Sequence, residues 1–209
     1  MIEMKAMRSA TVLLGIVLLA IACGTEKSVG PSQSDPTADY PSAVGSEWIY
    51  ERYDSSSGTT DTLAVRLTSF LQINDGLARA ELQYLNSACI VSRYLYFRGD
   101  TVSLHVGAST RSQVFQSYVF PLEPGNAWQV YFPHDSARVV ARDMATVPAG
   151  TFRKVYVIRR MYTFFDSIYF DTIWFVPGVG IVQRHVIDDQ YSQGIQGSFW
   201  RLLSYRIPE

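Results

Sequence analysis

The sequence predicts an all-β fold: a single curved antiparallel sheet, a half-barrel or barrel-like meander, after an N-terminal signal segment and a flexible tether. Three observations predict it. Apolar residues beyond residue 43 recur at every second position, which is the spacing of strands and not of helices. Turn-forming clusters separate these runs. Valine, isoleucine, threonine and aromatic residues, which strands favour, are abundant throughout.

The composition excludes two classes of protein: intrinsically disordered chains and nucleic-acid-binding proteins. The chain has 209 residues, of which 47% are hydrophobic and 18% charged, so it has enough apolar side chains to form a core. Its formal net charge is -1, so no excess of basic residues is available to neutralise nucleic-acid phosphates. We therefore expect a folded domain that has no nucleic-acid partner.

The N-terminus reads as an export signal. Lys5 and Arg8 precede an apolar run from residue 10 to residue 22. That run is shorter than the roughly 20 residues that a membrane-spanning helix needs, and it suits the hydrophobic region of a signal peptide. We assign residues 1–22 to this signal peptide.

The residues around Cys23 resemble the lipobox of bacterial lipoproteins. The stretch Leu19–Gly24 reads LAIACG, with small Ala22 directly before the cysteine. The resemblance implies that Cys23 receives a diacylglycerol, that the chain is cut before it, and that this lipid anchors the protein to a membrane. Gly24 in place of an aspartate resembles outer-membrane sorting, so we expect the cell envelope, at the outer membrane, facing the periplasm or the cell surface. An ordinary signal peptide with a coincidental cysteine, or an uncleaved anchor, is the alternative.

Residues 23–42 form the expected lipidated cysteine and disordered tether, because they are rich in Gly, Ser, Pro, Thr and Asp. The antiparallel β domain then occupies residues 43–209. The chain has one other cysteine, Cys89, which lacks an intrachain partner if Cys23 is lipidated. Its neighbours Ile90 and Val91 are apolar, so we expect Cys89 to be a small buried residue.

Within the β domain, ten to twelve strands are expected between Trp48 and Ile207. The side chains of Leu63, Val65 and Leu67 alternate with polar neighbours and should face one side. The expected turns are the segments 54–58, 74–76, 98–101, 121–126, 148–150 and 177–180, each of which holds Gly or Pro.

Three short motifs resemble a pattern in uncharacterised bacterial envelope lipoproteins. They are Gly45–Tyr50 (GxxWxY), Val147–Phe152 (VPAGTF) and Pro177–Val182 (PGVGxV). The resemblance implies a curved antiparallel sheet similar to the half-barrels of lipoprotein-carrier proteins. It supplies no catalytic residue.

The residues that carry chemistry do not form a recognised motif. His105, His134 and His185 are far apart in the chain, and no second ligand stands at metal-site spacing. Asp171 and the other acids near the aromatic strand are expected in solvent at strand ends. We therefore expect no enzyme activity, no catalytic residue, no metal and no cofactor.

One aromatic strand is the remaining candidate site. Ile168, Phe170, Trp174 and Val176 occupy alternate positions and should share one strand face. Either a closed sheet buries this face by packing, which we favour, or the face lines an apolar groove. The expected role is non-enzymatic binding or scaffolding in the envelope, with an apolar ligand or an envelope protein as partner. The alternatives are a carrier of lipid or another apolar ligand in a concave sheet, and a cryptic hydrolase.

Overall fold

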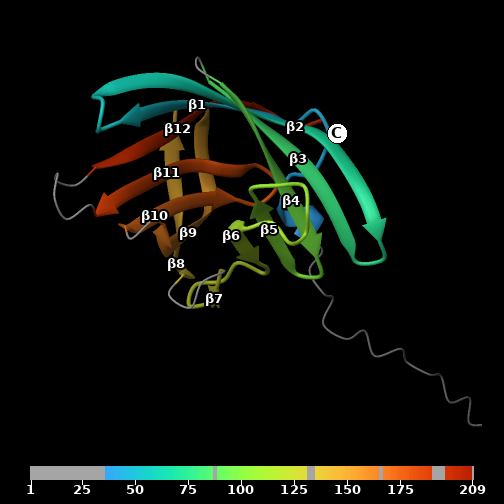
Figure 1. The fold of residues 1–209 in the computed structure, drawn as a ribbon. Coiled ribbons are helices and arrows are strands. Elements are labelled where there is room, and N and C mark those ends of the chain that lie inside the picture. Colours follow the sequence, from blue (N-terminus) through green and yellow to red (C-terminus); the bar gives the residue numbers. More distant parts are fainter. Residues whose placement is uncertain (1–35, 87–88, 131–134, 165–166, 190–195, 209) are drawn as a thin grey trace, which may run out of the picture. The chain divides into compact units, whose positions relative to one another are not determined.

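The computed structural model describes residues 36–86, 89–130, 135–164, 167–189 and 196–208. Cys23, the signal segment and most of the tether lie outside these residues. The described chain contains one short helix and twelve strands (Figure 1). The elements are α1 (Pro36–Asp39), β1 (Glu47–Asp54), β2 (Thr59–Asn74), β3 (Leu77–Leu85), β4 (Ile90–Arg98), β5 (Thr101–His105), β6 (Val114–Val119), β7 (Ala127–Gln129), β8 (Ser136–Val147), β9 (Gly150–Phe164), β10 (Ser167–Val176), β11 (Gly180–Asp189) and β12 (Gln196–Arg206).

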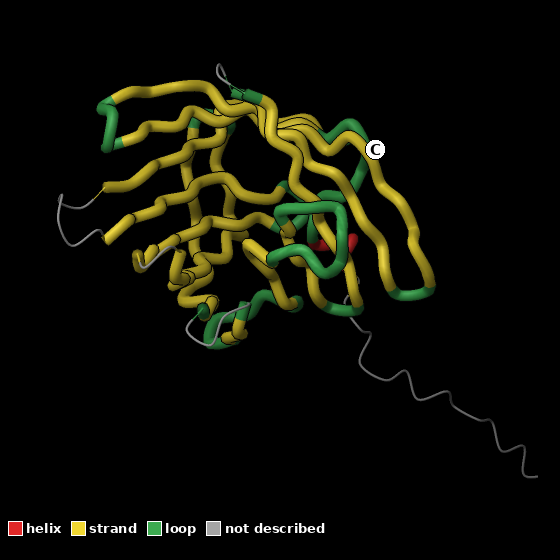
Figure 2. The backbone as a smooth tube through the Cα atoms, in the orientation of Figure 1, coloured by secondary structure: helices red, strands yellow, loops and turns green. Residues whose placement is uncertain are grey.

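All twelve strands belong to one antiparallel sheet. Its order is β6-β5-β4-β3-β2-β1-β12-β11-β10-β9-β8-β7. Strands that follow one another in the chain are paired, except β6 and β7, which are the two sheet edges, and β1 pairs with β12. The sheet curves into a nearly closed barrel with two arms, β1–β6 and β7–β12 (Figure 2). The predicted fold class, a single curved antiparallel meander, is confirmed.

The predicted turns join these strands. The segment 54–58 connects β1 to β2, and 74–76 connects β2 to β3. The turn between β8 and β9 is at 148–149, before Gly150 at φ 137°. A side chain at such a positive φ would be strained, which explains the glycine in the VPAGTF motif.

The core lies on the inner face of the curved sheet. Leu63, Val65 and Leu67 on β2 are buried, and the residues between them are more exposed, as the alternation predicts. On β10 the buried apolar residues are Ile173, Phe175 and, at the end of the strand, Val176. An apolar interior enclosed by one sheet stabilises the fold, since burial of apolar surface is the main favourable term.

One end of the interior is closed by the segment that precedes β1. The ring of Tyr40 is buried and lies 5.7 Å from that of Phe175 and 6.1 Å from that of Phe97. The N–H of Gly178 donates a hydrogen bond to the carbonyl of Asp39 at 2.9 Å. Asp39, Tyr40 and Pro41, which the sequence places at the end of the tether, thus contact the sheet, and Tyr40 fills the barrel end.

Two of the three sequence motifs meet at this closed end. Nε1 of Trp48 donates to the carbonyl of Val179 at 2.6 Å, and the hydroxyl of Tyr50 donates to the carbonyl of Ile181 at 2.8 Å. Gly180 has φ 99°, and a Cβ there would lie 3.4 Å from Cγ of Pro41. The GxxWxY and PGVGxV segments therefore tie β1 to the turn between β10 and β11.

The two sheet edges, β6 and β7, are joined by side chains. On β6, the carbonyl of Ser117 accepts from Nε1 of Trp128 at 3.0 Å, and the carbonyl of Phe115 accepts from Nη1 of Arg160 at 2.6 Å. The backbone carbonyls of residues 115 and 117 are on the same edge of the strand, because they are two positions apart. These bonds satisfy backbone groups that an edge strand leaves unpaired, and so they help to close the barrel.

Candidate functional site

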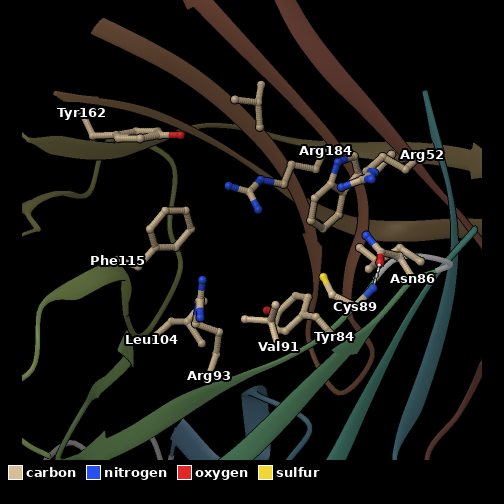
Figure 3. A pocket seen from close by; sticks show the side chains of 13 residues that line it. Arg52, Tyr84, Asn86, Cys89, Val91, Arg93, Leu104, Phe115, Tyr162 and Arg184 are labelled. Atoms are coloured by element: carbon tan, nitrogen blue, oxygen red, sulfur yellow. Dashed lines mark hydrogen bonds between the residues drawn. The ribbon is translucent and has the colours of Figure 1, made fainter. Parts of the chain in front are cut away.

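A pocket of about 420 Å³ lies inside the barrel, between its two arms (Figure 3). Its walls combine apolar and aromatic side chains with arginines. The lining residues are Arg52, Leu63, Tyr84, Asn86, Cys89, Val91, Arg93, Leu104, Phe115, Tyr162, Arg184, Val186 and Trp200. No aspartate or glutamate is among these described residues, so the charge that faces the pocket is positive.

A buried ion cluster supports one wall of the pocket. Nε and Nη2 of Arg184 donate to the two carboxylate oxygens of Asp171, at 3.0 and 2.8 Å. Nη2 of Arg160 lies 3.5 Å from the same carboxylate. Arg160, on β9, is directly opposite Asp171 on β10, and Arg184, on β11, is opposite Ile173 and thus diagonal to Asp171. The sheet register therefore brings the three groups together.

The cluster is almost fully removed from solvent. The relative exposures of Asp171, Arg160 and Arg184 are 1%, 3% and 6%. Burial lowers the pKa of Arg184, but the attraction and hydrogen bonds of Asp171 outweigh it and raise this pKa above its usual value. For Arg160, burial prevails over Asp171 and lowers the pKa. Both guanidiniums remain charged, since arginine keeps its proton in proteins, and one carboxylate is shared between two cations.

Aromatic rings hold the two guanidiniums in place. Cζ of Arg160 lies 4.1 Å from the ring centre of Tyr162 and 5.1 Å from that of Phe115. Cζ of Arg184 lies 5.0 Å from the ring centre of Trp200 and 6.0 Å from that of Phe115. A cation near an aromatic face is attracted to its electron density. The Nε and Nη2 atoms of Arg160 still have no hydrogen-bond partner among the described residues.

Two further arginines, Arg52 and Arg93, line the pocket. Arg52 forms a bidentate pair with Asp61, at 2.9 and 2.6 Å, and the side chains are 28% and 26% exposed. Arg93, on β4, donates to the backbone carbonyl of Ser92 at 3.1 Å and has no carboxylate partner in the described structure. Figure 3 shows Arg93 and Arg184 entering the same space from different walls.

Cys89 is exposed, which corrects the prediction of a buried thiol. It lies just before β4 and lines the pocket, and its N–H donates to Oδ1 of Asn86 at 2.8 Å. The apolar residues after it belong to the start of a strand, where the chain has not yet entered the core. Apolar neighbours in sequence therefore did not indicate burial.

A second, narrow pocket of about 40 Å³ lies at the closed end of the barrel and shares Tyr84, Leu104, Arg184 and Trp200 with the first. Tyrosines line this narrow end, among them Tyr40, Tyr50 and Tyr118. Burial raises the pKa of each of these phenols, so they are neutral hydrogen-bonding groups at any physiological pH.

The face of β10 that the sequence offered either as a packed face, the favoured alternative, or as a groove is for the most part turned away from the pocket. Phe170 is 45% exposed, and Trp174 is only partly buried. Ile173 and Phe175, which alternate with these positions, face the core. None of Ile168, Phe170, Trp174 and Val176 lines the pocket. Residues 168, 170 and 174 lie on the outer face of β10, and Val176 is buried at its end.

The prediction for Asp171 was wrong, because this residue was expected in solvent but is buried in the core. One signal was available, because an acid in the middle of an aromatic strand, with arginines in two other apolar strands, is unusual unless the charges pair. The sequence did not indicate which arginines would be opposite, since that depends on strand order.

The described histidines lie away from the pocket. His105 is buried on the outer side of β5, where Nε2 is 3.0 Å from Oγ of Ser103 and Nδ1 is 3.2 Å from the carbonyl of Ser112. Burial lowers its pKa. His185 is exposed and packs edge-on against Phe199. His134 lies outside the described residues. Within the described chain, no three His, Cys, Asp or Glu side chains gather as metal ligands.

Comparison with known proteins gives a likeness of fold. No protein-family model matches the chain, and no curated protein matches its sequence. The chain is similar to a candidate exported protein with a YmcC-like fold from Bacteroides fragilis, at 14% identity and a TM-score of 0.53, over 80% of this chain and 98% of that one. It also matches a candidate lipoprotein from Parabacteroides distasonis, at 15% identity and a TM-score of 0.49, over 80% and 97% of the two chains. At these identities, what this chain shares with the Bacteroides fragilis protein is its YmcC-like fold.

Proposed function

We propose that this protein is a lipid-anchored, non-enzymatic protein of the cell envelope that binds an amphipathic ligand inside its barrel. The observation that carries the proposal is the interior pocket of about 420 Å³. Ligand sites in proteins usually enclose roughly 300–1,000 Å³ and are lined mainly by apolar and aromatic side chains. The pocket favours the carrier alternative over a purely scaffolding role, because a sheet that only packs on itself needs no such space.

The walls of the pocket suit the apolar part of a ligand. Leu63, Val91, Leu104 and Val186 supply aliphatic surface from four strands. Phe115, Tyr162, Tyr84 and Trp200 add aromatic surface. Burial of apolar ligand surface here would contribute about 25 cal/mol per Å².

Binding suits the pocket better than catalysis does. Among the lining residues that the structure describes, Cys89 is the nucleophile, and neither a histidine nor a carboxylate lines the pocket with it. A catalytic cysteine is commonly activated by an adjacent general base, and no described lining residue supplies one. The buried arginines are instead held by Asp171 and by aromatic rings, which fixes them as a rigid binding surface.

Filling the pocket should abolish ligand binding. Val91 lines the pocket on β4, so Val91→Trp places an indole in the space that the ligand needs. We expect N-phenyl-1-naphthylamine, a neutral apolar dye, to fluoresce with the parent protein and to lose at least tenfold in affinity with this variant. The measurement is a dye titration on residues 23–209, produced without the signal segment and with Cys23→Ser, accompanied by native mass spectrometry of the purified protein for a retained ligand.

The matched control is Val140→Trp, which adds the same side chain at an exposed position on the outer face of β8. It should leave dye binding unchanged. If the parent does not bind the dye, or if the two tryptophan variants bind it equally well, the proposal is wrong.

Cys23 should carry the membrane anchor. Two or more acyl chains give stable membrane binding, because each buried CH₂ contributes about 0.8 kcal/mol. Cys23→Ser should therefore abolish incorporation of labelled fatty acid and leave the precursor unprocessed, as measured by metabolic labelling and gel mobility. Cys89→Ser is the control and should retain both label and processing. Labelling that survives Cys23→Ser would contradict the anchor.

A further inference from the structure

We infer that the ligand of the barrel carries an anionic head group, a carboxylate, phosphate or sulfate, and that Arg93 and Arg184 receive it. This inference rests on the proposed function and names the class of ligand that the pocket selects. The first observation is the charge of the lining, which includes Arg52, Arg93 and Arg184 and no acid among the described residues.

The ion pairs around the pocket leave positive charge uncompensated. The guanidiniums in or beside the pocket are those of Arg52, Arg93, Arg160 and Arg184, and the carboxylates in ion pairs with them are Asp61 and Asp171. Four cations thus face two anions. Arg160 and Arg184 are the buried ones and share a single carboxylate, and a buried charge without its own counter-charge is costly. An anion that enters the pocket beside Arg184 would reduce that cost.

The geometry shows where the positive charge is available. Arg184 uses Nε and Nη2 for Asp171, so Nη1 lies outside this bidentate pair. Because Asp171 is shared with Arg160, it does not neutralise both guanidiniums. Arg93 has no carboxylate partner in the described structure, and its side chain enters the pocket from the other arm (Figure 3).

The two arginines lie between apolar walls, and this feature distinguishes the pocket from a site for a small inorganic anion. Leu104 and Phe115 line the same pocket as the two arginines, and Trp200 lies against Arg184. A charge-assisted hydrogen bond in such a partly desolvated place is stronger than one in water. The pocket therefore selects a molecule with an acidic head and an apolar body, and not a small inorganic anion.

The test compares an acid with its neutral ester. The probes are 11-(dansylamino)undecanoic acid and its methyl ester, titrated by fluorescence against residues 23–209 that carry Cys23→Ser and lack the signal segment. The acid should bind about tenfold or more tightly than the ester, since hydrogen bonds to charged groups are worth about tenfold or more in affinity. Arg93→Gln should remove most of that preference without changing the affinity for the ester, and Arg93→Lys should restore part of it.

The control variant is Arg153→Gln, which removes the same charge from an exposed site on β9 that does not line the pocket. It should leave the affinity for both probes unchanged. Inorganic phosphate should displace the acid only at millimolar concentration, and displacement at micromolar phosphate would overturn the assignment to an amphiphile.

The outcomes separate the two proposals. Equal binding of acid and ester, or an acid preference that Arg93→Gln leaves intact, would overturn the anionic head group while the binding function stands. Failure of both probes to bind would overturn the proposed function itself.

Discussion

Replacing Asp171 with Asn should lower the free energy of unfolding by about 3–5 kcal/mol, the usual cost of removing one partner of a buried ion pair. The loss arises because Arg160 and Arg184 would remain charged and buried without a carboxylate between them. Asparagine has nearly the same shape, so the variant tests the charge and not the packing. The measurement is urea unfolding followed by tryptophan fluorescence.

The chain offers a matched control for this result. Asp61 forms the same bidentate pair with Arg52, but the pair is partly exposed. Asp61→Asn should therefore cost at most about 1 kcal/mol, as exposed ion pairs do. Equal losses for the two variants would mean that the Asp171 cluster is not desolvated, which would also remove an observation that supports the anionic ligand.

The turns could be predicted because their chemistry is local. Gly150, for example, occupies a turn that requires positive φ, and no distant contact is needed to recognise it. The faces of β2 could also be predicted, since its apolar residues alternate with polar ones, and the side that bears Leu63 and Leu67 must be the buried one. The all-β fold class and the meander topology could be predicted from these two signals.

The pocket could not be predicted, because it depends on which strands become neighbours. Arg160, Asp171 and Arg184 belong to three strands, and only the order β9-β10-β11 and its register make them meet. Arg93 comes from the opposite arm, so its approach to Arg184 also requires the sheet to close. Alternation along single strands carries no information about either requirement.

Strand β10 shows why period two alone did not identify its inner face. Apolar side chains occupy both faces, with Phe170 and Trp174 on one and Ile173 and Phe175 on the other. The face with Asp171 looks less hydrophobic, yet it is the inner one, because the ion pairs with Arg160 and Arg184 satisfy the carboxylate. A pattern of hydrophobicity cannot distinguish a paired buried charge from a solvated one.

The orientation of β10 leads to the second large expected effect. Phe175→Ala should cost about 3–5 kcal/mol of unfolding free energy, the range for a buried aromatic residue. Phe175 is 0% exposed, and its ring lies 5.2 Å from that of Tyr118 and 6.0 Å from that of Phe120. Its removal would also leave Tyr40 without a ring that it packs against, so the closed end of the barrel should loosen.

Phe170→Ala is the control, because it makes the same truncation five residues earlier on the outer face of the same strand. Phe170 is 45% exposed, so the loss should be below about 1 kcal/mol. Both variants are compared by urea unfolding with the parent chain. A larger loss for Phe170→Ala than for Phe175→Ala would reverse the two faces of β10. It would also place Asp171 in solvent, and the arginine-lined pocket would then lose the wall on which its selectivity for an anion depends.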